Sequence, residues 1–322
     1  MHLRFLIGLA LVSAAAVQAA PPQATIANSR VRAQLYLPDA QSGYYRGTRF
    51  DYSGVISSLE WNGHSYFGQW FGRYDPKLHD AITGPVQEFD SLGYDEAKPG
   101  ESFVRIGVGA VRKPAEPGYR RFSTYDIADP GTWSVRRSAD RVEFLHTLKD
   151  TGGYAYEYRK TVRLKSATLV LEHRLKNTGR KAMATSVYDH DFFMLDTQPT
   201  GPDFVLRFPF EIKAVAPLNG AAEVRGNDFV YLKELQPGET VQTQLTGFGS
   251  TAKDYDFRLE NRKTGAGVRQ SSDRPISRFN LWSIRSNISP EAYIDLSIAP
   301  GQSSAWRISY EFYQVRGSER TP

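Results

Sequence analysis

The sequence of 322 residues contains no cysteine. This absence excludes disulfide bonds, catalysis by a thiolate, and zinc sites with thiolate ligands. Histidine is also scarce, with six in the whole chain, and no close pair of a histidine and a carboxylate has the usual spacing of metal ligands. A phosphate-binding loop and a serine nucleophile elbow are missing as well. We therefore expect neither a metal site nor a cofactor.

Charge of one sign is nowhere concentrated along the chain. The formal net charge is +5, with 40 basic and 35 acidic residues that alternate throughout, and no polybasic block is present. Nucleic acid is therefore a poor candidate partner. The small positive balance favours anionic ligands weakly.

Long apolar runs are missing except at the N-terminus. Arg4 gives a short positive start, residues 5–17 are apolar, and small residues follow at the expected cleavage positions. We predict a signal peptide over residues 1–19 and a single domain over residues 20–322, exported to the periplasm or secreted. The apolar run is too short to span a bilayer comfortably, so we expect no membrane span in the mature protein.

Helical periodicity sustained over three turns is missing too. Residues 162–165 and 169–175 instead alternate apolar and polar side chains around a short turn, as antiparallel strands do. Many similar segments, separated by Gly, Pro and Asn turns, predict an all-β fold, a large antiparallel β-sandwich. Two stretches, residues 71–101 and 115–132, interrupt the pattern and are predicted loops.

The run from Tyr188 to Leu195 is the most informative motif. It places His190 between Asp189 and Asp191, on a segment that is otherwise apolar. A histidine titrates near ~6.5, and flanking carboxylates would hold it cationic or ready to donate a proton. The alternative is a core histidine whose neighbours satisfy its hydrogen bonds. In a strand, alternate residues point to opposite faces, which would turn both aspartates away from the imidazole.

These segments resemble the galactose mutarotase-like superfamily, the aldose 1-epimerases and their relatives. Residues 190–195 (HDFFML) match the pattern His-x-Tyr/Phe-Phe/Trp-x-Leu, and residues 290–301 resemble the closing hairpin. Arg49, followed by residues 53–56, and the segment 61–66 resemble the glycine-rich arginine segment and the hairpin near the N-terminus. The resemblance covers most of the mature chain. It implies the galactose mutarotase-like supersandwich, with a sugar-binding cleft on a concave sheet.

The resemblance also implies a catalytic set without a cofactor. His190 would be the general acid, His79 a second histidine that orients the sugar, and Glu291 the general base. In the family the base is a glutamate several residues before a proline-containing turn, and the place nearest to it here holds Arg285. A guanidinium cannot act as a base at neutral pH. Glu88, in the first loop, is the reserve candidate for this role.

Four residues are candidates for substrate binding. Arg49 and Arg285 could hydrogen-bond a sugar hydroxyl or carboxylate, Glu88 could accept from hydroxyls, and Trp282 could stack on a sugar ring. For Arg49 the alternative is an ordinary surface ion pair. For Trp282 the alternative is packing in the core.

The expected partner is therefore a mono- or oligosaccharide, and the oligomeric state is left open. The leading hypothesis is an exported aldose 1-epimerase-like protein that interconverts sugar anomers by acid–base chemistry. A carbohydrate-binding protein that lacks the base is the second reading, and the arginine at position 285 supports it. A polysaccharide lyase on the same fold is the third.

Overall fold

The computed structural model describes residues 20–315, so the predicted signal peptide, residues 1–19, lies outside the described residues. Within this range the chain forms 23 strands and two short 3-10 helices, η1 (Leu195–Thr197) and η2 (Ala252–Asp254). Every pairing between the strands is antiparallel, and they form sheets of ten, six, four and three strands. The prediction of an all-β fold with large antiparallel sheets is confirmed.

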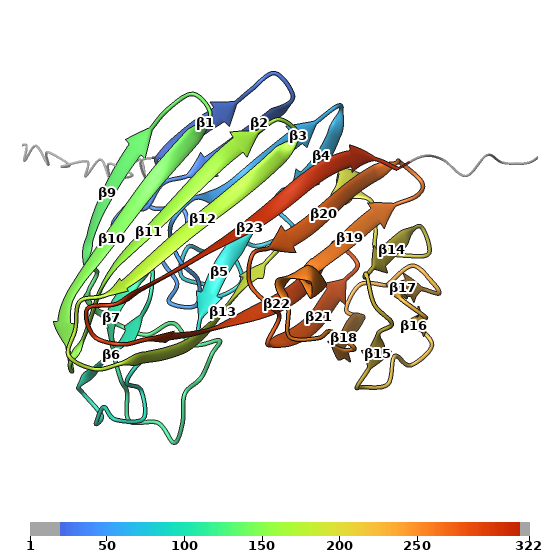
Figure 1. The fold of residues 1–322 in the computed structure, drawn as a ribbon. Coiled ribbons are helices and arrows are strands. Elements are labelled where there is room, and N and C mark those ends of the chain that lie inside the picture. The colour runs from blue at the N-terminus through green and yellow to red at the C-terminus, as the bar shows by residue number, and fades with distance from the viewer. Residues whose placement is uncertain (1–19, 316–322) are drawn as a thin grey trace, which may run out of the picture.

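The ten-stranded sheet forms the broad layer that sweeps across Figure 1. Its strands, in spatial order, are β16 (Ala222–Arg225), β17 (Asp228–Tyr231), β14 (Phe204–Arg207), β19 (Asp256–Asn261), β20 (Ala266–Ser272), β23 (Ser303–Gln314), β12 (Thr168–Asn177), β11 (Tyr154–Lys165), β10 (Arg141–Thr151) and β9 (Thr132–Arg137). The predicted hairpin is β11 and β12, with Lys165 opposite Thr168 across the turn.

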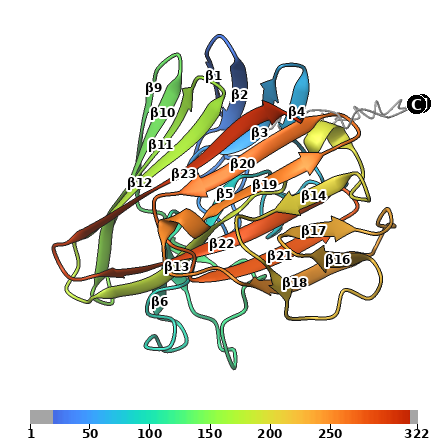
Figure 2. The same ribbon diagram turned by 45° about the vertical axis from the view of Figure 1, so that its right-hand side comes forward.

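The six-stranded sheet carries the candidate site. Its order is β15 (Lys213–Ala214), β18 (Thr240–Thr246), β21 (Arg278–Ile284), β22 (Asn287–Ile298), β13 (Met183–His190) and β5 (Val86–Phe89). Figure 2 shows β22, β21 and β18 beneath the strands β20, β19 and β14 of the larger sheet. One continuous apolar cluster contains Leu171 and Ile308 from the ten-stranded sheet and Val187, Leu281 and Ile294 from the six-stranded sheet. The two sheets therefore pack face to face around a common core.

Two smaller sheets complete the strand content. One contains β1 (Gln23–Ala27), β2 (Val31–Tyr36), β3 (Val55–Trp61) and β4 (His64–Phe67), and the other contains β6 (Ser102–Arg105), β7 (Gly109–Arg112) and β8 (Ile127–Asp129). The prediction that residues 71–101 form a loop throughout is wrong for β5, which pairs with β13. Because all four residues of β5 are buried, its sequence lacks the alternation of a half-exposed strand.

A second apolar cluster covers the outer face of β13 and β22. It is built mostly from the irregular segments 37–54 and 68–85 and from residues 93–125, which contain β6 and β7, and it includes Phe50, Ile82, Tyr125 and Phe192. For this reason the last four residues of β13 and the first eight of β22 are buried on both faces. Polar groups at the ends of these strands therefore lie between the sheet and the segments that cover it.

Candidate functional site

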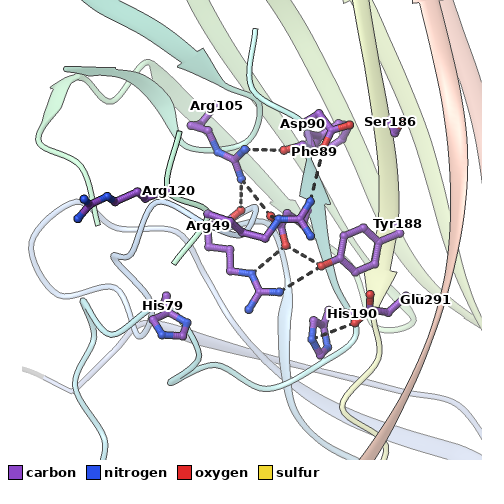
Figure 3. Close-up of polar contacts among 12 residues, drawn as sticks. Arg49, His79, Phe89, Asp90, Arg105, Arg120, Ser186, Tyr188, His190 and Glu291 are labelled. Atoms are coloured by element: carbon purple, nitrogen blue, oxygen red, sulfur yellow. Dashed lines mark hydrogen bonds and ion pairs between the residues drawn. The ribbon is translucent and has the colours of Figure 1, made fainter. Parts of the chain in front are cut away.

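The sheet register brings His190 and Glu291 together. In β13 and β22, Val187 pairs with Ile294, and the same register continued along the strands places His190 opposite Glu291. The imidazole Nε2 lies 3.3 Å from Glu291 Oε1, and both side chains are almost completely buried, at 5% and 8% exposure. Figure 3 shows the two side chains facing each other. This pair is called the dyad below.

His190 is held by contacts on every side. Its Nδ1 lies 2.8 Å from the Ser289 hydroxyl, and the ring of Phe192 stacks on the imidazole with centroids 3.8 Å apart. The rings of Phe50 and Trp282 meet it edge-on, each with a centroid distance of 5.6 Å. The imidazole can therefore keep one orientation, with Nε2 directed at Glu291.

His190 is neutral at neutral pH, in contrast to the expectation of a cation held by its flanking aspartates. Burial lowers the pKa of this histidine well below its usual range, and the positive charges of Arg49 and Arg121 lower it further. The two aspartates do not counter this effect, since strand alternation sends them to the inner face of the sheet. A neutral imidazole carries one N–H and one acceptor nitrogen.

Asp189 and Asp191 instead bind one tyrosine of the opposite sheet. The Tyr310 hydroxyl lies 2.5 Å from Asp189 Oδ2 and 2.7 Å from Asp191 Oδ1. A hydroxyl has one hydrogen, so two such short contacts require a proton on one of the carboxyl groups. Burial and the charge of Asp189 raise the pKa of Asp191 well above its usual range, which assigns that proton to Asp191. The two aspartates therefore anchor β13 and leave proton transfer to the other face of the strand.

Glu291 has the ionisation expected of an acid–base group. Burial raises its pKa from 4.5 to about 7, opposed by Arg49 and reinforced by the negative charge of Glu88. The amide of Asn280 donates to its Oε2 at 3.5 Å, from the neighbouring strand β21. At neutral pH both forms of this carboxyl group are thus populated, so it can accept or donate a proton.

Glu88 is a permanently charged anion, unlike Glu291. Its carboxylate lies 2.8 Å from Arg49 Nε, 3.0 Å from Arg121 Nε and 3.8 Å from an Arg105 nitrogen, and it accepts from the Tyr188 hydroxyl at 2.6 Å. Burial alone would raise the pKa of Glu88, but the three guanidinium groups outweigh it and lower the pKa. A low pKa fits the pairing of buried arginines better than it fits a general base.

Arg49 joins the dyad region to the loop that carries His79. Its guanidinium binds Glu88, donates to the Tyr188 hydroxyl at 3.3 Å and pairs with Asp80. In the view of Figure 3, His79 lies on the other side of Arg49 from the dyad. The Nδ1 atom of His79 is 2.9 Å from Asp80 without hydrogen-bond geometry. The structure therefore places His79 near the site but outside the dyad.

The other two candidates for substrate binding lie in different places. Trp282 stands on β21 beside His190, half-buried, where its ring can form a wall for a sugar. Arg285 lies in the turn between β21 and β22, where it pairs with Glu234 and donates to the Leu235 carbonyl at 3.1 Å. Its side chain is engaged outside the cluster around the dyad. Spacing had placed Arg285 nearest to the position of the family's glutamate. In the structure a hairpin turn, and not a strand, occupies position 285.

Arg121 and Asn280 belong to the site although no sequence pattern indicated them. Arg121 lies in the predicted loop over residues 115–132, and its contacts with Glu88 on β5 and with Tyr293 on β22 connect it to the site. Asn280 could be found only from the register between β21 and β22. Next to Arg121, Phe122 is largely exposed, and its ring lies 5.0 Å from that of His79.

Two further properties concern metal ions and membranes. Within residues 20–315, no group of three or more histidine or acidic side chains is arranged to hold a metal ion. In the same range no helix has the length and apolar character needed to cross a membrane.

Comparison with known proteins shows the fold. No protein-family model and no curated protein matches the chain. Among solved structures, the chain is similar to the GalM/aldose epimerase homologue of Caenorhabditis elegans, with a TM-score of 0.59, 14% identity, and coverage of 92% of this chain and 100% of the other.

Galactose mutarotase-like proteins of Lactobacillus casei and Clostridium acetobutylicum are also similar. Their TM-scores are 0.53 and 0.54, and their identities 15% and 11%. The alignments cover 90% and 91% of this chain, and 100% and 95% of the respective partners. The chain thus has the galactose mutarotase-like fold, as the sequence motifs predicted.

Proposed function

We propose that this chain is an aldose 1-epimerase-like enzyme that interconverts sugar anomers by acid–base chemistry at the His190–Glu291 dyad. The observation that carries the proposal is the distance of 3.3 Å between Nε2 and Oε1. The two oxygens that exchange a proton in this reaction are bonded to the same anomeric carbon. Two catalytic atoms this close can therefore face both oxygens at once.

In the proposed reaction the Glu291 carboxylate accepts the proton of the anomeric hydroxyl. The neutral imidazole donates its Nε2 proton to the ring oxygen, and the bond between the anomeric carbon and the ring oxygen breaks. The imidazolate that this leaves would be stabilised by the positive charges of Arg49 and Arg121. The open-chain aldehyde rotates about the bond from C1 to C2 and closes on its other face, with each proton transfer reversed. On closure the ring hydroxyl returns its proton to Nε2 and Glu291 returns its proton to the carbonyl oxygen, so no net proton is taken from water.

The surroundings of the dyad suit these roles. The Ser289 hydroxyl, at 2.8 Å from Nδ1, can hold the tautomer that has its proton on Nε2 by donating to Nδ1. A neutral imidazole can polarise a substrate oxygen without carrying a full charge. Trp282 offers a ring face to the sugar, and Asn280 steadies the carboxyl group of Glu291.

The test is the relaxation of optical rotation after α-D-glucose or α-D-galactose is dissolved in a solution of the purified protein. The proposal expects faster relaxation with the wild type and a loss of about 10²- to 10⁴-fold with His190→Asn or Glu291→Gln. Glu157→Gln, an exposed carboxylate on β11, is the matched control and should keep the wild-type rate. Variants of the dyad that remain as fast as the wild type would refute it.

A non-catalytic carbohydrate-binding protein is the second candidate, and the burial of the dyad favours it. Only 4% of His190 and 6% of Glu291 is exposed, so a substrate must displace covering side chains to reach them. Sugar binding without any effect on the relaxation of rotation would support this function.

A lyase that uses a tyrosine base is less favoured, because Tyr188 donates to Glu88 and its pKa is raised well above the usual value.

Export is part of the proposal and rests on residues 1–19. Their positive start, apolar run and small residues are typical of a secretory signal. Expression of the full chain and of a chain that starts at Ala20, followed by cell fractionation, tests it. Equal distribution of both forms would contradict export through this segment.

A further inference from the structure

Two arginines that face solvent lie on one side of the dyad. The Arg278 guanidinium sits over the ring of Tyr293, 3.8 Å from its centroid, and is exposed. Arg121 reaches the same area from its loop, with 34% of its side chain exposed. Tyr293 is two residues from Glu291 on β22, and both project from the same face of the strand.

The register fixes the spacing between Arg278 and the dyad. Arg278 pairs with Tyr293, and Asn280 pairs with Glu291, so the two side chains of β21 point to the same face. Residues two apart in a strand are separated by about 7 Å. Asn280 donates to the Tyr293 hydroxyl at 3.2 Å and to Glu291 at 3.5 Å, which ties this row of side chains together. Arg278 is therefore about one sugar ring away from the carboxyl group of the dyad.

The two arginines differ from the buried ones in how their charge is balanced. Arg49 is already bound by Glu88, Asp80 and Tyr188. Arg121 has one close carboxylate, Glu88, and Asp90 at a more distant 3.7 Å. Among residues 20–315, no carboxylate oxygen lies within 4 Å of the Arg278 guanidinium.

The carboxylate of Asp295, on the paired strand β22, is already engaged. Asp295 accepts hydrogen bonds from the hydroxyls of Ser186 and Ser277 at 2.7 and 2.8 Å. The region beside the dyad thus keeps positive charge that can bind an anion.

We propose that the substrate is an anionic sugar whose acidic group binds Arg278 and Arg121 while its anomeric carbon lies at the dyad. This inference rests on the proposed function and specifies its substrate class. In a hexuronic acid the carboxylate is attached to C5, which the ring oxygen joins to the anomeric carbon. The acidic group and the reacting atoms then lie along one edge of the ring, as Arg278 and Glu291 lie along one face of the sheet. A phosphate on the C6 oxygen would present the same chemistry two bonds further away.

The experiment compares D-glucuronate, D-glucose 6-phosphate and D-glucose as substrates in the polarimetric assay. We expect kcat/KM for at least one anionic sugar to exceed that for D-glucose about tenfold or more. The two anions separate a carboxylate site from a phosphate site. Arg278→Gln should lower the ratio of kcat/KM for the preferred anion to that for D-glucose about tenfold, and Arg121→Gln should lower it similarly. Arg225→Gln, which removes an exposed guanidinium on β16, is the control and should leave the ratio unchanged.

Two results would overturn the inference. One is a kcat/KM for D-glucose equal to or above the values for both anions, and the other is an unchanged ratio in Arg278→Gln. If no sugar relaxes faster with the protein, the proposed function fails, and calorimetric binding of the same three sugars then decides the inference. Tighter binding of an anion that Arg278→Gln abolishes would support it, and equal binding of all three sugars would refute it.

Discussion

Glu291→Gln should stabilise the protein at alkaline pH while it removes catalysis. In the folded protein the pKa of Glu291 is about 7, compared with an ordinary value of 4.5. Between these values the folded state keeps a proton that the unfolded chain has released. The unfolding free energy of the wild type therefore falls as pH rises through this window. The glutamine amide resembles the protonated carboxyl group and does not titrate. The unfolding free energy of Glu291→Gln therefore does not fall in this window.

The size of the effect follows from the same two values. One pKa unit corresponds to about 1.4 kcal/mol, so the rise in the pKa of Glu291 is worth about 3 kcal/mol. Only 8% of the side chain is exposed, so water screens little of this energy. The advantage of Glu291→Gln over the wild type should thus grow by about 3 kcal/mol between about pH 4 and about pH 8.

Urea denaturation followed by tryptophan fluorescence measures this difference at both pH values. Glu157→Gln is the control, because an exposed carboxylate should give a curve parallel to that of the wild type. If the stability difference between Glu291→Gln and the wild type is the same at both pH values, Glu291 titrates normally. The assignment of Glu291 as the titrating group of the dyad would then be wrong.

Three further predictions concern the same region. The rate of mutarotation should rise with pH through about 7 as Glu291 loses its proton, and polarimetry over a pH series would contradict this with a flat profile. Glu88→Gln should cost about 3–5 kcal/mol of unfolding free energy, because Arg49 and Arg121 then lose the buried counter-charge that they share, and urea denaturation will show a smaller loss if that charge is not needed. Tyr310→Phe should cost about 1–3 kcal/mol by the same measurement, since Asp189 and Asp191 lose a buried partner. A loss below that range would show that the two aspartates satisfy each other.

The fold was largely predictable because its long strands alternate clearly. In β11 and β12 the apolar residues point to the core, and a short turn separates the strands, so local pattern and tertiary structure agree. Strand β5 was missed because both of its faces are covered and four buried residues show no alternation. Its position depends on pairing with β13, about 100 residues away, which no local pattern reports.

The sequence indicated which residues form the dyad. The protonation state of His190 was harder to predict. The motif around His190 and the proline-containing segment around Glu291 both indicated the dyad. Strand alternation correctly predicted that Asp189 and Asp191 turn away from the His190 imidazole, so the alternative of a cation held by these aspartates does not apply. The two arginines that lower the pKa of His190 are distant in sequence and could not be predicted. Charge at a buried group is set by its neighbours in space, and these come from segments whose packing the sequence does not reveal.

Arg105 has a consequence for how this site could be altered. Its guanidinium donates to the backbone carbonyls of Thr48 at 3.0 Å, Phe89 at 2.6 Å and Arg49 at 2.5 Å, so one side chain joins an irregular segment to the edge strand β5. Together with the hydrogen bond from the Asp51 N–H to the Gln87 carbonyl at 2.9 Å, these contacts take the place of the longer ladder that a neighbouring strand would provide. An engineer who grafts a different segment over residues 37–54 therefore needs to preserve a pair of adjacent carbonyl groups that face Arg105, as well as the side chains of Arg49 and Phe50, which contact Glu88 and His190. The part of the attachment that depends on Arg105 thus requires only the backbone of the covering segment, so the remaining side chains of residues 37–54 are the ones open to redesign.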